Sequence, residues 1–244
     1  LALEREALIA IYNALDGDNW TNNDNWCSDK PISEWWGVSC ENGMNVTGLQ
    51  IMGNASPNSA RVLFPKEIAH LKYLRSLYIE RTNIDAFPQE ISDINIEVLQ
   101  SVDNIFLHLT DFAPIYKTNN LKSFRVVNFI DFFYDLSDTY KIPSQIPDEL
   151  LNNKDLKYLI LMGCNLSGEI PDKLWKLTNL EYLELYNFWE TYLYGTIPPA
   201  IANLHNLKTL RFYNLNLSGG IPEELYTLNQ LEHLAIDCCN IGGH

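Results

Sequence analysis

Two stretches of this chain are closely similar: "CNLSGEIPDKLWKLTNLEYLEL" at residues 164–185 and "LNLSGGIPEELYTLNQLEHLAI" at residues 215–236. Their alternating pattern L-x-L recurs along most of the sequence. Aligned units begin near Leu49, Leu77, Leu99, Phe124, Leu159, Leu183, Leu210 and Leu234, with steps of 28, 22, 25, 35, 24, 27 and 24 residues. A period of this length is typical of repeat architectures, in which each unit is one small element stacked on the next.

The leucine pattern predicts how one unit folds. Successive side chains of a strand point to opposite faces, so the leucines of L-x-L point inward and the x positions point outward. One unit cannot bury its own leucines, but stacked units can. The chain is therefore predicted to be an α/β protein, a curved solenoid with a parallel inner sheet, about eight repeats and an apolar core behind the sheet.

Proline followed by acidic residues marks the segment after several predicted strands. These segments are "PKE" (65–67), "PQE" (88–90), "PDE" (147–149) and "PEE" (222–224). Proline suits the first position of a helix, and carboxylates are stabilised at its positive N-terminal end. We interpret these acids as helix-start residues and not as a catalytic pair.

Three units continue with "LSGEIP" (166–171), "LYGTIP" (193–198) and "LSGGIP" (217–222). This pattern resembles the leucine-rich repeat family, in its plant-type or extracellular subclass, from Val46 to the C-terminus. The run from "EREALIAIYNALDGDNW" to "WWGVSC" resembles the N-terminal cap of the extracellular members. The resemblance implies a helical cap over residues 1–45 and a solenoid over 46–244, with insertions near 129–144 and 188–192.

A cap of this kind covers the exposed end of the apolar core. Its helix is expected to bury one stripe, and its indoles are expected to pack beside that stripe; these residues are Leu8, Ile11, Tyr12, Leu15, Trp20, Trp26 and Trp36. The resemblance also implies a disulfide between Cys27 and Cys40, which would point to an oxidising compartment.

The remaining cysteines fall elsewhere in the pattern. Cys164 and Cys239 each follow the leading leucine of a repeat by five residues, a position that the family fills with Asn or Cys, so they are expected to be free. Cys238 has no assigned state.

Composition excludes some functions. The net charge of -14 opposes binding to nucleic acid, whose affinity comes mainly from neutralising phosphates, and favours a cationic or neutral partner. No apolar run is long enough for a transmembrane helix. Glu4, Arg5 and Glu6 interrupt the first residues, so any export signal is expected to have been removed. The predicted location is secreted or on the cell surface, and the style of "LDGDNWTNNDNW" (15–26) resembles bacterial surface proteins.

No constellation typical of an enzyme is present. The five histidines form no H-E-x-x-H pattern, and neither a G-x-S-x-G elbow nor a phosphate loop occurs. Asp131, Asp135 and Asp138 lack the glycine and the terminal glutamate of a calcium loop. We predict no catalytic residue, no metal and no cofactor.

The outward positions of the predicted strands are unusually aromatic, although packing of the core makes no demand on them. The two insertions follow directly after their strands, so both should leave the same edge of the sheet and flank a groove. The predicted ligand-binding residues are Tyr134, Tyr158, Met162, Tyr182, Glu184, Tyr186, Trp189, Arg211 and Tyr213. Tyr134 and Trp189 are the expected walls, while Glu184 and Arg211, on adjacent strands, supply polarity or simply pair with each other.

These features favour a non-enzymatic module that binds a protein or peptide and promotes adhesion or recognition. Stacked aromatic rings with flanking carboxylates would also suit a glycan, which is the alternative. A third possibility is a structural or adhesive spacer within a surface assembly, and such a spacer would bind neither ligand.

Overall fold

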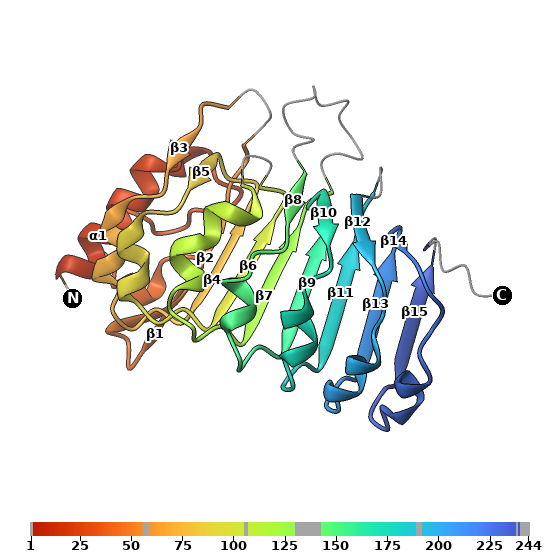
Figure 1. Ribbon diagram of the computed structural model, residues 1–244. Helices are drawn as coiled ribbons and strands as arrows, with labels where there is room; N and C mark the ends of the chain where they lie inside the picture. The colour runs from red at the N-terminus through yellow and green to blue at the C-terminus, as the bar shows by residue number, and fades with distance from the viewer. Residues whose placement is uncertain are drawn as a thin grey trace. The chain divides into compact units, whose positions relative to one another are not determined.

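The computed structural model describes residues 2–55, 59–104, 107–129, 143–188, 192–237 and 239. The chain forms two compact units, Leu1–Thr118 and Asn119–His244. Figure 1 shows the strands of both units, coloured along the chain. The division predicted at residues 45 and 46, between a cap and a solenoid, stays a prediction.

The first unit is built on strands that follow one another in chain order. Strand β1 (Val38–Glu41) pairs antiparallel with β2 (Asn45–Met52), and β2, β4 (Ser76–Glu80) and β6 (Val98–Val102) pair in parallel. A small parallel pair, β3 (Val62–Leu63) and β5 (Ile84–Ala86), lies beside them. The helical segments are α1 (Ala2–Ala14), η1 (Gly17–Asn19), η2 (Ile32–Glu34), η3 (Lys66–His70), η4 (Gln89–Asp93), η5 (Leu109–Phe112) and α2 (Ala113–Tyr116).

Helix α1 caps this unit as predicted. Leu8 and Ile11 are fully buried and Leu15 nearly so, and the helix packs against η3 of the first repeat. Trp20 and Trp26 stack edge to face with ring centroids 5.0 Å apart. The third packed indole is Trp35 and not Trp36, because Trp35 lies 5.2 Å from Trp26 and is 1% exposed, whereas Trp36 is half-buried.

Cys27 and Cys40 are not joined in the structure, so the disulfide that the resemblance implies stays a prediction. Cys27 is exposed and lies near the charges of Asp18 and Arg5, whereas Cys40, on β1, lies near Glu4. Burial is the main cause that raises the pKa of each thiol. The two sulfur atoms therefore have different surroundings, which their spacing in the sequence does not reveal.

The second unit repeats one strand five times. Strands β7 (Ser123–Val127), β9 (Tyr158–Met162), β11 (Tyr182–Tyr186), β13 (Thr209–Tyr213) and β15 (His233–Asp237) pair in parallel in chain order. A second parallel sheet contains β8 (Ser144–Gln145), β10 (Leu166–Glu169), β12 (Tyr192–Gly195) and β14 (Asn216–Leu217). The helical segments are η7 (Leu150–Asn152), η8 (Asp172–Lys176), η9 (Pro199–Asn203) and η10 (Glu223–Thr227).

Burial alternates along these strands as the leucine pattern predicts. The inward residues of β9, β11 and β13 are all fully buried: Leu159, Leu161, Leu183, Leu185, Leu210 and Phe212. Each leading residue identified in the sequence lies in a parallel strand of its unit. The architecture is thus the predicted leucine-rich solenoid with a helical cap.

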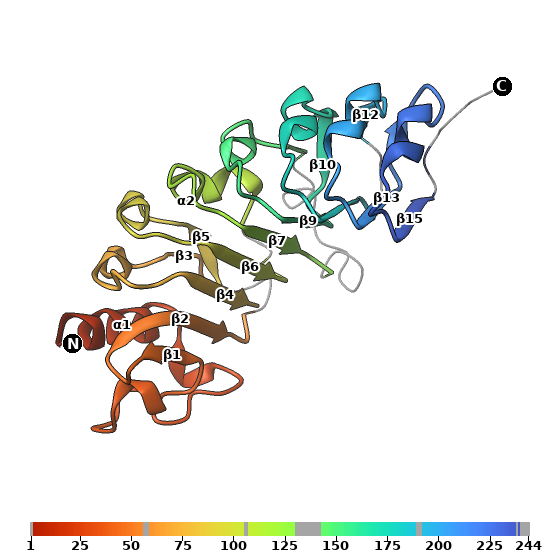
Figure 2. The same ribbon diagram turned by 90° about the horizontal axis from the view of Figure 1, so that it is seen from below.

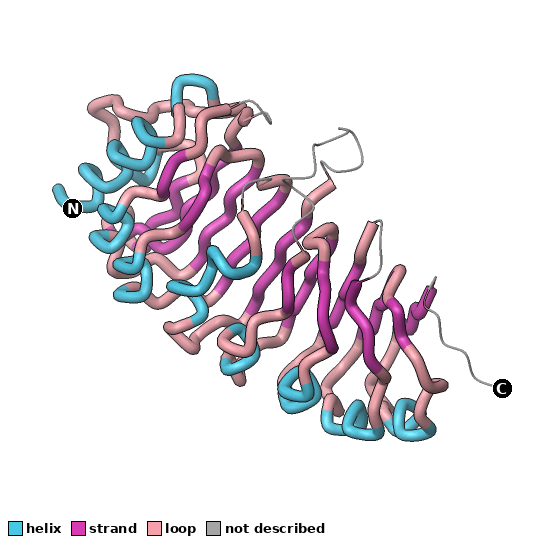
Figure 3. The backbone as a smooth tube through the Cα atoms, turned by 45° about the horizontal axis from the view of Figure 1, so that its top comes forward, coloured by secondary structure: helices cyan, strands magenta, loops and turns pink. Residues whose placement is uncertain are grey.

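The segments after the prolines differ from the expected form. They are short 3₁₀ helices, and the proline lies just before the helix and not in its first turn. Pro65 precedes η3 in this way, and Pro171 precedes η8. Figures 2 and 3 show these segments, within each unit, on the side of the repeat opposite to the long strands. No helix among the described residues therefore covers the outward side of either long sheet. None of the described helices is long and apolar enough to cross a membrane.

Candidate ligand-binding site

The register of the five long strands in the second unit arranges their outward residues in three rows. From the N-terminal to the C-terminal ends of β7, β9, β11, β13 and β15, the rows are Ser123, Tyr158, Tyr182, Thr209 and His233; Arg125, Ile160, Glu184, Arg211 and Ala235; and Val127, Met162, Tyr186, Tyr213 and Asp237. The predicted residues Tyr158, Met162, Tyr182, Glu184, Tyr186, Arg211 and Tyr213 all lie on this one face. Tyr134 and Trp189 lie outside the described residues.

The polar part of this face is a three-residue cluster. The Tyr182 hydroxyl donates to Glu184 Oε2 at 2.7 Å and accepts from Arg211 Nη1 at 3.0 Å. Arg211 Nη1 lies 3.9 Å from Glu184 Oε2, and its guanidinium carbon lies 5.8 Å from the centre of the Tyr182 ring. The lateral pairing expected of Glu184 and Arg211 is thus present, but the phenol of Tyr182 mediates it.

Electrostatics keep the phenol of this cluster protonated. Burial first, and then the hydrogen bond and charge of Glu184, raise the pKa of Tyr182 to about 12, while Arg211 and Arg125 act in the opposite direction. Glu184 points outward yet is only 6% exposed, because its neighbours on the sheet cover it. The cluster therefore presents a fixed donor and acceptor pattern, with Arg211, whose side chain is 40% exposed, as its accessible charge.

Glu184→Gln should lower the pKa of Tyr182 from about 12 toward the ordinary tyrosine value of about 10. The phenolate becomes easier to form when the facing carboxylate charge is gone, although the burial of the ring remains. Tyrosine labelled with ¹³C at Cζ, titrated by NMR, measures this pKa directly. Glu181→Gln is the control, because Glu181 pairs with Lys157 and Lys208 and does not contact the phenol. An unchanged Tyr182 pKa in Glu184→Gln would show that the carboxylate does not act on it.

The apolar part of the face is an aromatic cluster of Phe129, Tyr186, Phe188 and Tyr213. Tyr186 lies 5.3 Å from Tyr213 and 4.9 Å from Phe188, and Phe188 lies 5.9 Å from Phe129, all measured between ring centroids. Phe129 follows β7 and Phe188 follows β11, so the two predicted insertions begin at the same edge of the sheet. Their first residues meet over the end of β9, the strand that carries no insertion.

Gly163 makes that meeting possible. It follows β9 with a φ of +65°, and a β-carbon there would lie 2.1 Å from the Asn128 carbonyl oxygen and 2.6 Å from the Phe188 ring. The backbone nitrogen of Gly163 donates a hydrogen bond to the backbone carbonyl oxygen of Tyr186 at 2.9 Å. The backbone nitrogen of Asn128 donates one to the carbonyl oxygen of Met162 at 3.0 Å. Glycine thus lets the chains on both sides close over the end of β9.

Comparison with known proteins agrees with this geometry. The family model described as Leucine Rich Repeat matches residues 155–177 and 206–228. The ectodomain of the Arabidopsis thaliana membrane receptor kinase GASSHO1/SCHENGEN3, solved with CASPARIAN STRIP INTEGRITY FACTOR 2, superposes with a TM-score of 0.63 at 21% identity, over 100% of this chain and 30% of that one. This is a leucine-rich repeat fold.

Two further solved structures share the leucine-rich repeat fold. The Arabidopsis receptor kinase HAESA, in complex with the peptide hormone IDA and the co-receptor SERK1, gives a TM-score of 0.52 at 23% identity, over 98% of this chain and 46% of that one. An internalin from Listeria monocytogenes gives 0.52 at 20% identity, over 75% and 47%. The chain thus spans less than half the length of these structures. No curated protein sequence matches it.

The leucine-rich repeat pattern also explains which residues the sequence did not single out. Phe129 and Phe188 stood only among the many aromatics of the insertions, and Gly163 and Arg125 were not selected. The sequence did contain a signal for Gly163: the next two repeats have an asparagine, Asn187 and Asn214, at the equivalent position after the strand, so the glycine departs from the repeat. The sulfur atoms of Cys164 and Cys239 lie 3.6 Å from the carbonyl oxygens of Met162 and Phe212, respectively. Cys238 lies outside the described residues.

Proposed function

We propose that this chain is a non-enzymatic binding module of a secreted or surface protein, and that it recognises an extended peptide segment of a protein partner. The peptide would lie across the outward face of β9, β11 and β13. One observation carries the proposal: an aromatic cluster and a polar cluster lie next to each other on the outward face of the sheet.

The chemistry of the face suits a peptide. Aromatic side chains anchor interfaces because they bury a large area at low cost in conformational entropy. Tyr158 and Phe129 are 42% and 40% exposed, which leaves ring surface for a partner to cover. Arg211 can donate to backbone carbonyls of a bound strand, while the buried Glu184 holds the guanidinium in place.

The similar structures support the same reading. Plant receptor ectodomains of this fold have been solved with the peptide hormones that their descriptions name. Both plant and bacterial proteins occur among the similar structures, so the bacterial origin stays a prediction.

Tyr186→Ala and Tyr213→Ala should each weaken peptide binding by about 2 kcal/mol or more, which is roughly 30-fold in Kd. Because the ligand is unknown, binders are first selected from a displayed library of random 12-residue peptides, and their Kd values are then measured by calorimetry. Trp189→Ala belongs to the same series. Tyr226→Ala is the matched control, since Tyr226 is 76% exposed on η10, away from this face.

Two results would contradict the proposal. One is that the tyrosine variants bind every selected peptide as tightly as the unaltered chain. The other is that both variants lose most of their thermal stability, because the rings would then belong to the scaffold. A library that yields no binder, together with silence on a glycan array, would favour the spacer.

A further inference from the structure

The outward face of the first unit carries a hollow of about 330 Å³. Its base is formed where Ser39, Gly48 and Ser76 lie side by side on β1, β2 and β4. The next row is formed by longer side chains, Gln50 on β2, Tyr78 on β4 and Gln100 on β6. Short residues beside long ones therefore create the depression, whose volume falls in the range of small-ligand sites.

Gly48 determines the shape of the hollow. A β-carbon at this position would lie 2.8 Å from the Ser76 hydroxyl and 3.2 Å from the Ser39 β-carbon. The two serines thus close in over the bare backbone of β2, and no side chain rises between them. The antiparallel strand β1 supplies Ser39, so the hollow depends on the junction of the cap with the first repeat.

The lining is polar but uncharged. It consists of Gly37, Val38, Ser39, Gly48, Leu49, Gln50, Ser76, Leu77, Tyr78, Val98 and Gln100. Among the described residues, the hydroxyls of Ser39 and Ser76 and the carboxamide of Gln100 have no hydrogen-bonding partner. The Gln50 amide has only a 3.5 Å contact with the sulfur of Met52. These groups remain available to a ligand.

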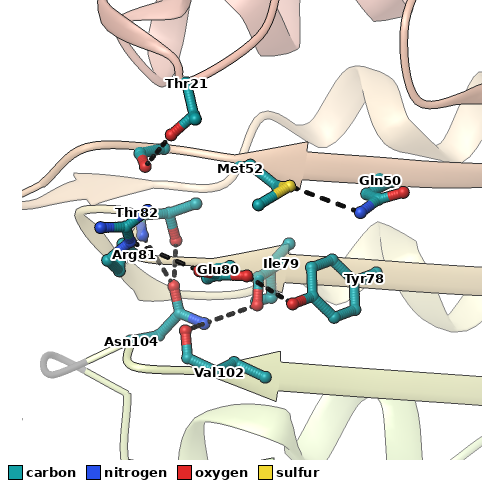
Figure 4. Close-up of polar contacts among 11 residues, drawn as sticks. Thr21, Gln50, Met52, Tyr78, Ile79, Glu80, Arg81, Thr82, Val102 and Asn104 are labelled. Atoms are coloured by element: carbon teal, nitrogen blue, oxygen red, sulfur yellow. Dashed lines mark hydrogen bonds and ion pairs between the residues drawn. The ribbon is translucent and has the colours of Figure 1, made fainter.

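Tyr78 adds a flat apolar surface in a fixed position. Its hydroxyl donates to Glu80 Oε2 at 2.5 Å, and Glu80 pairs in turn with Arg81 at 3.4 Å. Figure 4 shows Gln50 and Met52 on one strand, and Tyr78 and Glu80 on the strand beside it. The ring is thereby held along the row that borders the hollow.

We propose that this hollow binds one ring of a neutral saccharide. Hydroxyls and carboxamides both donate and accept hydrogen bonds, as sugar hydroxyls do, and the Tyr78 ring can cover the apolar face of the sugar. An anionic ligand is disfavoured, because the lining contains no cation, Glu80 lies in the next row and the chain carries a net charge of -14. A peptide side chain would find no deep apolar pocket here, in contrast to the aromatic cluster of the second unit.

The test uses three uncharged tetrasaccharides, namely cellotetraose, chitotetraose and mannotetraose, with tetragalacturonate as the anionic comparison. Each is titrated into the ¹⁵N-labelled chain while the side-chain amide signals of Gln50 and Gln100 are followed by NMR. At least one neutral tetrasaccharide should shift both signals, and tetragalacturonate should bind at least tenfold more weakly. Gln100→Leu and Gln50→Leu, which replace the carboxamide with a shorter apolar side chain, should each weaken the binding tenfold or more.

Gln230→Leu is the matched control, since Gln230 is an exposed glutamine of the second unit. Peptides selected on the second unit should bind Gln100→Leu as tightly as the unaltered chain, so this site and the peptide site can fail separately. The proposal is overturned if no neutral tetrasaccharide shifts the two signals. It is equally overturned if binding survives both glutamine variants or moves the signals of Tyr186 and Tyr213 instead.

Discussion

Asn104→Leu is expected to lower the free energy of unfolding by about 3–5 kcal/mol, because it strands several buried polar groups at once. Asn104 is fully buried. Its Oδ1 accepts from the Thr82 backbone nitrogen at 2.8 Å and from the Thr82 hydroxyl at 2.6 Å. Its Nδ2 donates to Ile79 O at 3.0 Å, Ser101 Oγ at 2.9 Å and Val102 O at 3.1 Å. Figure 4 shows how this amide joins β4 to β6.

Leucine has the same branching and number of side-chain heavy atoms as asparagine but is bulkier, so the loss would come from missing hydrogen bonds and crowding and not from a cavity. Urea unfolding followed by circular dichroism measures the change. Asn229→Leu is the control, because Asn229 is exposed in a turn and should change the stability by less than about 0.5 kcal/mol. If Asn104→Leu cost less than about 1 kcal/mol, the amide would not hold these repeats together.

Gly163→Ala should destabilise the second unit by about 3 kcal/mol and weaken peptide binding at least tenfold. Part of the loss, about 1 kcal/mol, comes from the positive φ of +65°. The larger part comes from the β-carbon, which would lie 2.1 Å from the Asn128 carbonyl oxygen, so that backbone itself must move. The displacement would separate Phe129 from Phe188 and open the aromatic cluster.

Gly219→Ala separates the two contributions. Gly219 also has a positive φ, +75°, but its β-carbon would meet only the Thr196 side chain, at 3.4 Å. This variant should therefore cost only the backbone contribution of about 1 kcal/mol. Urea unfolding and peptide affinity are measured for both variants. Equal losses of stability in the two would mean that the close approach at Gly163 is not what constrains this edge.

Much of the candidate site followed from local patterns. Tyr182, Glu184 and Tyr186 could be assigned to the outward face because inward leucines at Leu183 and Leu185 leave only one orientation for the residues between them. The same alternation placed Arg211 beside Glu184. What the pattern did not reveal is the phenol of Tyr182 between the two charges, because a hydrogen bond depends on side-chain rotamers that no spacing specifies.

The period and alternation of the leucines were sufficient to predict about eight parallel strands and the composition of the outward rows, while the capping helix was implied by the family resemblance of residues 1–45. These properties are local, since each depends on residues a few positions apart that must share one buried side. Tertiary structure alone decided that Phe129 meets Phe188 over Gly163 and that Ser39 and Ser76 close around Gly48. Each of these outcomes is a distance between segments far apart in the chain, and such distances are decided only when the repeats and the cap pack against their neighbours.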